Sequence, residues 1–174
     1  IGNYIYGGVE VLFRGSFEGA SHKITGLTIN RQNADYQGLF GYIYGGTVRN
    51  LGILGADITG GNNVGGVAGD VTGTVQNCYN TGSVSGKNYV GGVTGDLSNP
   101  DSIIKNCYNI GNINGVSIVG GITGRNNMGT VQNCYASGQI KGTGQDIGGI
   151  VGENAGPVKN CVALNPSVSG HLSV

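Results

Sequence analysis

The sequence of 174 residues carries little charge, and its charges are balanced. Lysine plus arginine number nine, aspartate plus glutamate also number nine, and only 10% of the residues are charged. Nucleic-acid binding would need a basic patch, and attachment to a membrane surface would need a polybasic or amphipathic segment. No apolar run approaches the roughly 20 residues of a membrane-spanning helix. We therefore expect no nucleic-acid partner and no membrane insertion.

Catalytic motifs are missing as well. The sequence has no His-Glu-x-x-His zinc motif, no Gly-x-Ser-x-Gly elbow and no glycine-rich phosphate loop, although it contains 37 glycines. Its two histidines, His22 and His171, lie far apart and are most simply surface or edge residues. We expect a non-enzymatic protein without a cofactor. The chain begins at Ile1 rather than Met, which we interpret as a fragment of a larger protein.

The dominant feature of the chain is a short unit that recurs at a fixed spacing. Copies are found at Val75–Tyr79, Ile104–Tyr108, Val131–Tyr135 and Val158–Val162, with a degenerate copy at Val48–Leu51. Successive asparagines are 27, 29, 27 and 27 residues apart. A constant period of this length indicates stacked supersecondary units rather than an ordinary globular core.

Two further runs recur between these copies. Apolar-Gly-Gly-apolar runs are found at Val64–Val67, Val90–Val93, Val119–Ile122 and Ile147–Ile150, with Gly38–Gly41 in the same slot, and Gly-x-Val/Ile-x-Gly runs are found at Gly82–Gly86, Gly111–Gly115 and Gly138–Gly142. Each run is short, rich in β-branched residues and bounded by Gly or Asn, which is typical of strands. No run has helical spacing.

Three short strands in about 27 residues predict an all-β parallel β-helix, or solenoid, of about six turns. We expect residues 1–174 to form a single domain, with repeats at approximately 24–49, 50–76, 77–105, 106–132, 133–159 and, in part, 160–174. A β-propeller is the alternative within the all-β class, but its blades need about 40 residues.

Alternation along the strands predicts where the repeated side chains point. Cys78, Cys107, Cys134 and Cys161 should face the core as free thiols; a disulfide between neighbours is the alternative, and a metal site lacks its usual CxxC spacing. Tyr79, Tyr108 and Tyr135 should face outward, unless the assignment is inverted. Asn50, Asn77, Asn106, Asn133 and Asn160 should adopt the left-handed conformation at a bend, with amides stacked from turn to turn.

The repeats resemble the GLUG motif of bacterial secreted and surface proteins. The resemblance rests on Gly38-Leu39-Phe40-Gly41, on the later Gly-Gly runs, and on the Gly-Thr-Val-x-Asn-Cys-Tyr pieces at Gly73–Tyr79 and Gly129–Tyr135. It covers the chain from about Phe13 to Gly170. It implies a secreted or cell-surface bacterial location in adhesin-like proteins, or in accessory regions of IgA-specific metallopeptidases. The resemblance transfers no catalytic residues.

Two columns remain as candidate sites. The tyrosines Tyr79, Tyr108 and Tyr135 could stack on a sugar or pack on a partner protein, or could simply stabilise the stack as a ladder. Asp70 and Asp96 occupy matched positions, followed by Arg125 and Glu153. They could form a solvated charge ladder, hold a cation together with Asp101, or act as paired acids on a polysaccharide. A regular β face could also bind ice, but the repeated Thr pairs that this function needs are missing.

We therefore expect a non-catalytic β-helical repeat module of a secreted bacterial surface protein, acting as an adhesin segment, a spacer or a binding surface. Its partners would be neighbouring domains of the same polypeptide, and a host protein or glycan. The alternatives are a β-helix polysaccharide lyase or hydrolase, and an accessory segment of a large secreted IgA-type metallopeptidase.

Overall fold

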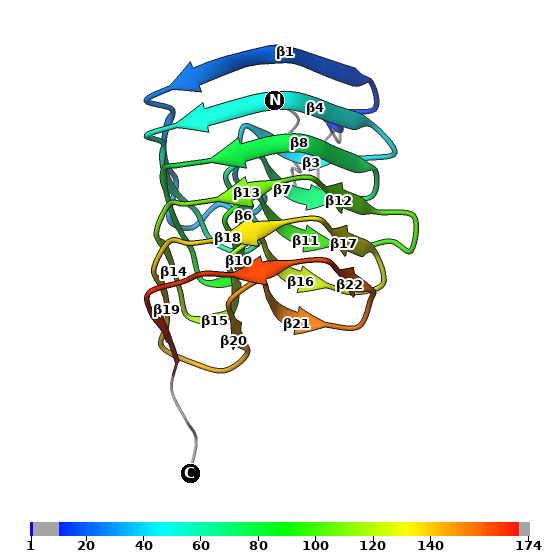
Figure 1. Cartoon of the computed structure of the whole chain (residues 1–174). Coiled ribbons are helices and arrows are strands. Elements are labelled where there is room, and N and C mark those ends of the chain that lie inside the picture. The colour runs from blue at the N-terminus through cyan, green and yellow to red at the C-terminus, as the bar shows by residue number, and fades with distance from the viewer. Residues whose placement is uncertain (2–10, 171–174) are drawn as a thin grey trace.

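The computed structural model describes Ile1 and residues 11–170, and it confirms the predicted parallel β-solenoid of about six turns (Figure 1). Successive turns pair in parallel and in register, as shown by Val48 opposite Val75 and Val75 opposite Ile104. The described part of the chain contains no helix that is long and apolar enough to cross a membrane.

The strands form four sheets that run along the axis of the solenoid. Sheet 1 contains β1 (Ser16–Thr25), β4 (Thr47–Leu54), β8 (Thr74–Asn80), β12 (Ile103–Lys105), β13 (Tyr108–Asn109), β17 (Thr130–Gln132), β18 (Tyr135–Ala136), β22 (Val158–Lys159) and β23 (Val162–Ala163). Sheet 2 contains β2 (Thr28–Asn30), β5 (Asp57–Thr59), β9 (Ser83–Ser85), β14 (Ile113–Gly115), β19 (Ile140–Gly142) and β24 (Val168–Ser169).

The other two sheets are formed by the segments around the Gly-Gly runs. Sheet 3 contains β6 (Val64–Gly65), β10 (Asn88–Gly91), β15 (Ser117–Gly120) and β20 (Ile147–Gly148). Sheet 4 contains β3 (Phe40–Ile43), β7 (Ala68–Val71), β11 (Thr94–Leu97), β16 (Thr123–Asn126) and β21 (Val151–Asn154).

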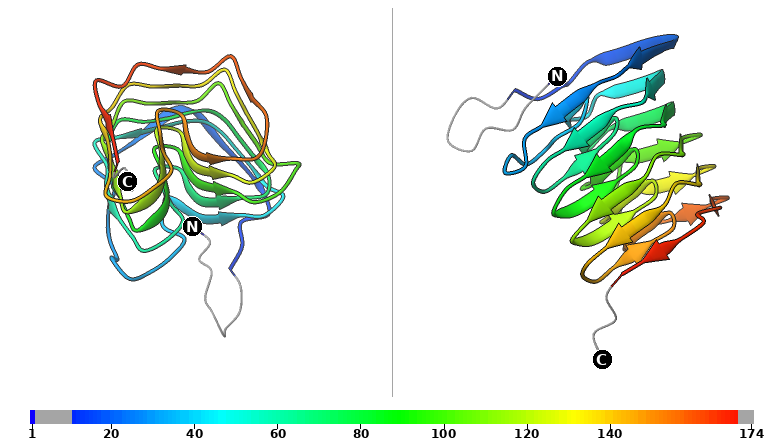
Figure 2. Two further views of the ribbon diagram at one scale, coloured as in Figure 1. Left: turned by 90° about the horizontal axis from the view of Figure 1, so that it is seen from below. Right: turned by 90° about the vertical axis from the view of Figure 1, so that its left-hand side faces the viewer.

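A complete turn therefore has four sides, where the sequence runs suggested three. The Gly-Gly run does not form one strand: β6 ends at Gly65, the chain bends through Gly66 and Val67, and β7 begins at Ala68. Seen along the axis, the outline of each turn is folded inward at this bend (Figure 2, left). The bend separates sheet 3 from sheet 4.

Glycine allows sheets 3 and 4 to pack closely across this inward fold. A Cβ atom at Gly95 of β11 would lie 2.6 Å from the backbone nitrogen of Val64, and one at Gly124 of β16 would lie 2.5 Å from that of Val90. Both distances are far shorter than a van der Waals contact, so any other residue would force the two sheets apart. The regular glycines thus allow sheets 3 and 4 of successive turns to approach each other closely.

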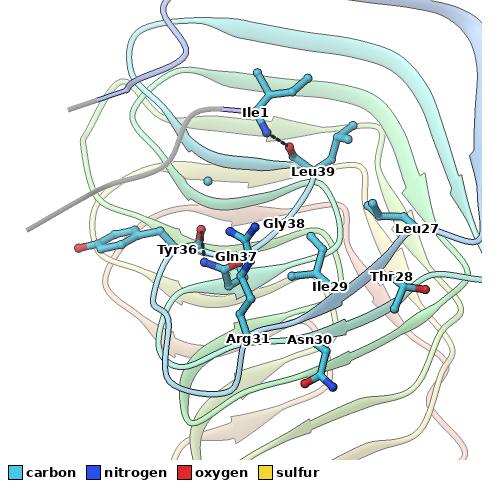
Figure 3. Close-up of a pocket in the computed structure, with 11 residues that line it drawn as sticks. Ile1, Leu27, Thr28, Ile29, Asn30, Arg31, Tyr36, Gln37, Gly38 and Leu39 are labelled. Carbon is cyan, nitrogen blue, oxygen red and sulfur yellow. Dashed lines mark hydrogen bonds between the residues drawn. The ribbon is translucent and has the colours of Figure 1, made fainter. Parts of the chain in front are cut away.

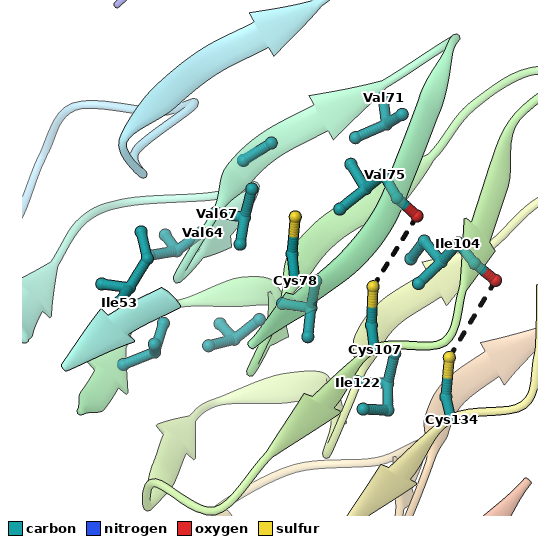
Figure 4. Packing of buried hydrophobic residues seen from close by; sticks show 14 of the residues in the cluster. Ile53, Val64, Val67, Val71, Val75, Cys78, Ile104, Cys107, Ile122 and Cys134 are labelled. Carbon is teal, nitrogen blue, oxygen red and sulfur yellow. Dashed lines mark hydrogen bonds between the residues drawn. The ribbon is translucent and has the colours of Figure 1, made fainter. Parts of the chain in front are cut away.

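The core is a narrow column of Val, Ile and Leu side chains enclosed by the four sheets (Figure 4). Ile53, Val75, Ile104 and Ile122 are completely buried, as is Phe40, whose ring packs against those of Phe13 and Phe17. Burying one such side chain stabilises the fold by about 1.5–3 kcal/mol. Because each turn adds its own layer, the hydrophobic stabilisation accumulates along the axis.

Two of the completely buried asparagines are linked to each other inside this apolar column. Asn80 and Asn109 are completely buried, and the Asn80 amide donates a 2.9 Å hydrogen bond to Oδ1 of Asn109. The Asn80 amide also donates to the carbonyl of Gly82, whose backbone N–H donates in return to Oδ1 of Asn80. These bonds offset the cost of burying the polar side chains and fix the bend between sheets 1 and 2.

Candidate functional site

The tyrosine column lies on the outer surface of sheet 1. Tyr79, Tyr108 and Tyr135 occupy equivalent positions in β8, β13 and β18, and the strands pair directly at these residues. Ring centroids are 4.6 Å apart between Tyr79 and Tyr108, and 4.9 Å apart between Tyr108 and Tyr135, with interplanar angles of 3° and 6°. The rings therefore cover each other's faces and present mainly their edges to solvent.

The two ends of the tyrosine column differ. Gly52 pairs with Tyr79, and its missing side chain leaves the space that the Tyr79 ring occupies, because a Cβ at Gly52 would collide with that ring. At the other end Tyr135 pairs with Val162, and both side chains are exposed, Tyr135 at 39%. Backbone at one end and neighbouring rings along its length thus cover most of the aromatic faces.

The predicted asparagine column forms a hydrogen-bonded ladder at the bend within sheet 1. Asn50, Asn77, Asn106, Asn133 and Asn160 all have φ between +52° and +57°. Each side-chain amide from Asn77 onward donates to Oδ1 of the asparagine one turn earlier, at 2.8–3.2 Å. The amide of Asn50 donates instead to the carboxylate of Glu18, which lowers the pKa of that carboxyl. Hydrogen bonds thus join the asparagine side chains of neighbouring turns along the ladder, and its role is structural.

The four cysteines form a file on the inner side of sheet 1, and all are free thiols. Cys78, Cys107 and Cys134 are buried, and Cys161 in the last turn is half-buried. The thiols of Cys107 and Cys134 point to carbonyl oxygens of the preceding turn, those of Val75 and Ile104 (Figure 4). Burial raises the pKa of Cys107, so its thiol stays protonated and unreactive.

Asp70 and Asp96 are neighbours in sheet 4, but the expectation of a solvated charge ladder is wrong. Asp70 is 6% exposed and Asp96 is 1% exposed, because the inward fold brings sheet 3 and its flanking residues over them. Arg125 in the next turn binds both carboxylate oxygens of Asp96, at 3.1 and 2.5 Å, and its guanidinium lies 4.3 Å from the centroid of the Tyr89 ring. Asp96 is therefore a buried carboxylate with a dedicated counter-ion.

Among the residues that the structure describes, no cation forms a salt bridge with Asp70. It accepts a 2.7 Å hydrogen bond from the hydroxyl of Ser98, while burial and the neighbouring charge of Asp96 raise its pKa to about 7. Asp101 belongs to the exposed loop that follows β11, where its backbone N–H donates to the side chain of Asn99. Among Ile1 and residues 11–170, no three His, Cys, Asp or Glu side chains are grouped so that they could hold a metal ion. The structure thus does not assemble the three aspartates into a cation site.

The structure adds an aromatic hollow that the sequence analysis did not identify. This open depression has a volume of about 510 Å³ and is lined by Leu12, Tyr36, Tyr42, Tyr44, Asp70, Thr72, Ser98 and Asn99. Tyr42 pairs with Asp70 across β3 and β7, so it is the earlier member of the same column. The signal was present in the sequence, since Gly41-Tyr42 matches Gly69-Asp70 and Gly95-Asp96 one and two repeats later.

A second pocket of about 330 Å³ lies at the first turn, where Leu27 and Ile29 are only partly buried (Figure 3). The terminal ammonium group of Ile1 donates a 2.6 Å hydrogen bond to the carbonyl oxygen of Leu39 at its edge. The Tyr36 ring points away from this pocket (Figure 3). The pocket has a mixed lining, in which the apolar side chains of Leu27 and Ile29 lie beside Arg31.

Comparisons with known proteins agree with this architecture. Residues 115–141 match the GLUG motif family, which confirms the resemblance found in the repeats. A stretch of 74 residues, 42% of the chain, is 45% identical to Halomucin from Haloquadratum walsbyi, of which it covers 1%. That relative is archaeal, so a bacterial origin of this chain remains an expectation.

A crystal structure of a candidate immunoglobulin A1 protease from Bacteroides ovatus is similar in fold, with a TM-score of 0.69 and 26% sequence identity. The similarity covers 90% of this chain and 52% of that chain. This chain thus spans about half of the solved relative and a very small part of Halomucin.

Proposed function

We propose that this chain is a non-catalytic β-helical module of a larger secreted or cell-surface protein, where it separates neighbouring domains and displays its side walls to a partner. The observation that carries the proposal is the parallel, in-register pairing of successive turns in sheet 1 from β4 to β22 and β23, with the asparagine ladder and the cysteine file at the repeated positions. A stack of such repeats is stiff along its axis and has no moving part. The match to Halomucin and the GLUG motif support an extracellular setting.

Surface accessibility tests this proposal on the full-length protein in its own cells. An antibody raised against residues 11–170 should label intact cells or the culture medium, and brief protease treatment of intact cells should remove the cell-bound signal. A matched antibody against a cytoplasmic protein provides the control for leakage. Signal found only after lysis would overturn the extracellular assignment.

The tyrosine column is the contact surface that we propose for a protein partner. Its stacked rings leave a row of edges and hydroxyl groups on sheet 1, with Tyr135 the most exposed member. Tyrosine edges of this kind are frequent in interfaces because they combine apolar area with a hydrogen-bonding group. Changing Tyr79, Tyr108 and Tyr135 together to Ser should abolish binding to cells or host extracellular proteins, whereas the triple change to Phe should retain the stack. Unchanged binding of the Ser variant would eliminate the column.

One observation favours a glycan-active enzyme as a second candidate. Asp70 has a pKa of about 7 and lines an open hollow, as a general acid would. Hydrolysis or lysis by paired carboxylates needs a second acid, yet Asp96 is 1% exposed and is bound by Arg125. Release of reducing ends or unsaturated products from acidic and neutral polysaccharides, abolished by Asp70→Asn, would establish this candidate. No turnover on any of them would retire it.

A further inference from the structure

The rings of the aromatic hollow are arranged differently from those of the tyrosine column. Tyr36 and Tyr42 have centroids 6.2 Å apart and nearly parallel planes at 12°, whereas Tyr42 and Tyr44 have centroids 6.0 Å apart with an interplanar angle of 74°. In the tyrosine column the corresponding distances are 4.6 and 4.9 Å with nearly parallel planes. The spacing is wider than in the tyrosine column, and Tyr44, which lies edge-on to Tyr42, is 44% exposed although the Arg14 guanidinium lies over its ring.

Hydrogen-bonding groups line the same hollow beside these rings. Asp70, Thr72, Ser98 and Asn99 converge on it from β7 and from the segments that follow β7 and β11. The Ser98 hydroxyl donates to Oδ1 of Asp70 at 2.7 Å, which fixes the orientation of the carboxyl group. The site thus places aromatic surface next to a carboxyl group of fixed orientation and to hydroxyl and amide groups. These features match a ligand that has one apolar face and hydroxyl groups around its edge.

We propose that the aromatic hollow binds a neutral carbohydrate, with the C–H face of one sugar ring against the tyrosines and its hydroxyls hydrogen-bonded to Asp70 and its neighbours. An acidic sugar fits less well, because its carboxylate would face Asp70. A cationic ligand also fits less well, because the guanidinium of Arg14 already lies 4.2 Å from the centroid of the Tyr44 ring. The site lies apart from the tyrosine column, so its failure would leave the proposed module role untouched.

The test is binding of immobilised neutral oligosaccharides of glucose, galactose, mannose, N-acetylglucosamine and xylose, followed by titration of the bound ones in solution. Tyr44→Ala and Asp70→Asn should each weaken binding at least about tenfold, because each removes one type of contact. Met128→Ala is the control: it removes a similarly exposed large apolar side chain (48% exposed) that lies outside the hollow, and it should change affinity less than twofold. Unfolding temperatures establish that the variants are folded.

Backbone amide chemical shifts provide a second measurement that needs no variant. Addition of the bound oligosaccharide to the wild-type chain should shift the signals of Tyr44, Asp70, Thr72 and Asn99, and leave those of Tyr108 in place. The proposal is overturned if none of the oligosaccharides binds, or if the shifts map elsewhere. It is also overturned if tetramethylammonium, run in parallel, binds at the hollow while the sugars do not, since this would identify a cation-binding aromatic cage.

Discussion

Asn106 donates a 3.0 Å hydrogen bond to Asn77 while its own backbone adopts a φ of +54°. It also accepts a 3.1 Å bond from Asn133, so one residue satisfies two separate requirements of the fold. The left-handed conformation disfavours most residues by about 1–2 kcal/mol, and a hydrogen bond contributes about 0.5–1.5 kcal/mol.

These two requirements can be separated by substitution. We expect Asn106→Ala to lower the free energy of unfolding by about 2–3 kcal/mol, since it loses both the amide and the tolerance of positive φ. Asn106→Gly should lower it by only about half as much, because glycine keeps the backbone conformation. Urea denaturation of the two variants measures the difference. Equal stabilities of the Ala and Gly variants would show that the backbone requirement is negligible.

Gly52 and Tyr79 form a second pair that should respond together. A methyl group at Gly52 would collide with the Tyr79 ring, so Gly52→Ala should destabilise the chain by about 1–3 kcal/mol. In the background of Tyr79→Ala the same change should cost much less, because the obstructing ring is gone. A double-mutant cycle in urea measures this coupling, and strict additivity would contradict the assigned contact.

The cysteine file predicts a graded reactivity. We expect a thiol reagent such as N-ethylmaleimide to modify Cys161 first in the native protein, because it is half-buried, and to leave Cys107 unmodified, because it is buried with a raised pKa. In denaturant all four thiols should react without prior reduction. Mass spectrometry of peptides after timed labelling measures the order. Fewer than four reactive thiols in denaturant would indicate a disulfide.

The fold could be predicted because its main determinant is the sequence period. The positions of Cys78 and Tyr79 on opposite faces of sheet 1 follow from alternation alone, once Leu51 and Ile53 are taken as core residues. The positive φ at Asn77 follows from the residue type at a bend. Each of these inferences uses a property that belongs to one strand or one turn, so a single sequence contains it.

The aromatic hollow and the burial of Asp96 depend on contacts between strands that no local pattern encodes. The Gly65-Gly66 run is compatible with one strand or with two, and only the packing of sheet 3 against sheet 4 decides for two. This inward fold buries Asp70 and Asp96, which the alternation of inward and outward side chains along a strand would leave exposed to solvent. The position of Tyr42 above Asp70 was accessible by counting back one repeat, but the repeat there is too degenerate to draw attention to it.

Arg125 should be essential to sheet 4 because it neutralises Asp96. The Asp96 side chain is 2% exposed and that of Arg125 is 27% exposed, so solvent cannot replace the lost guanidinium. Arg125→Ala should lower the free energy of unfolding by roughly 3–5 kcal/mol, as expected for an uncompensated buried charge. Adding Asp96→Asn should recover part of the loss. The unfolding free energies of the single and double variants test this, and a double variant no more stable than Arg125→Ala would contradict the charge explanation.

Asp70 predicts a dependence of stability on pH with a definite sign. Burial raises its pKa to about 7, whereas the unfolded chain loses this proton near pH 3.9. Between these values the folded state holds the proton and the unfolded state does not, so stability falls as pH rises from about 4 to 7, by up to roughly 4 kcal/mol. Asp70→Asn has no proton to lose there. Its stability relative to wild type, from urea denaturation at intervals between pH 4 and 8, should therefore rise with pH and level off above pH 7. Parallel curves for the two proteins would show that Asp70 is ionised throughout, and that the fold solvates this carboxylate far better than its burial indicates.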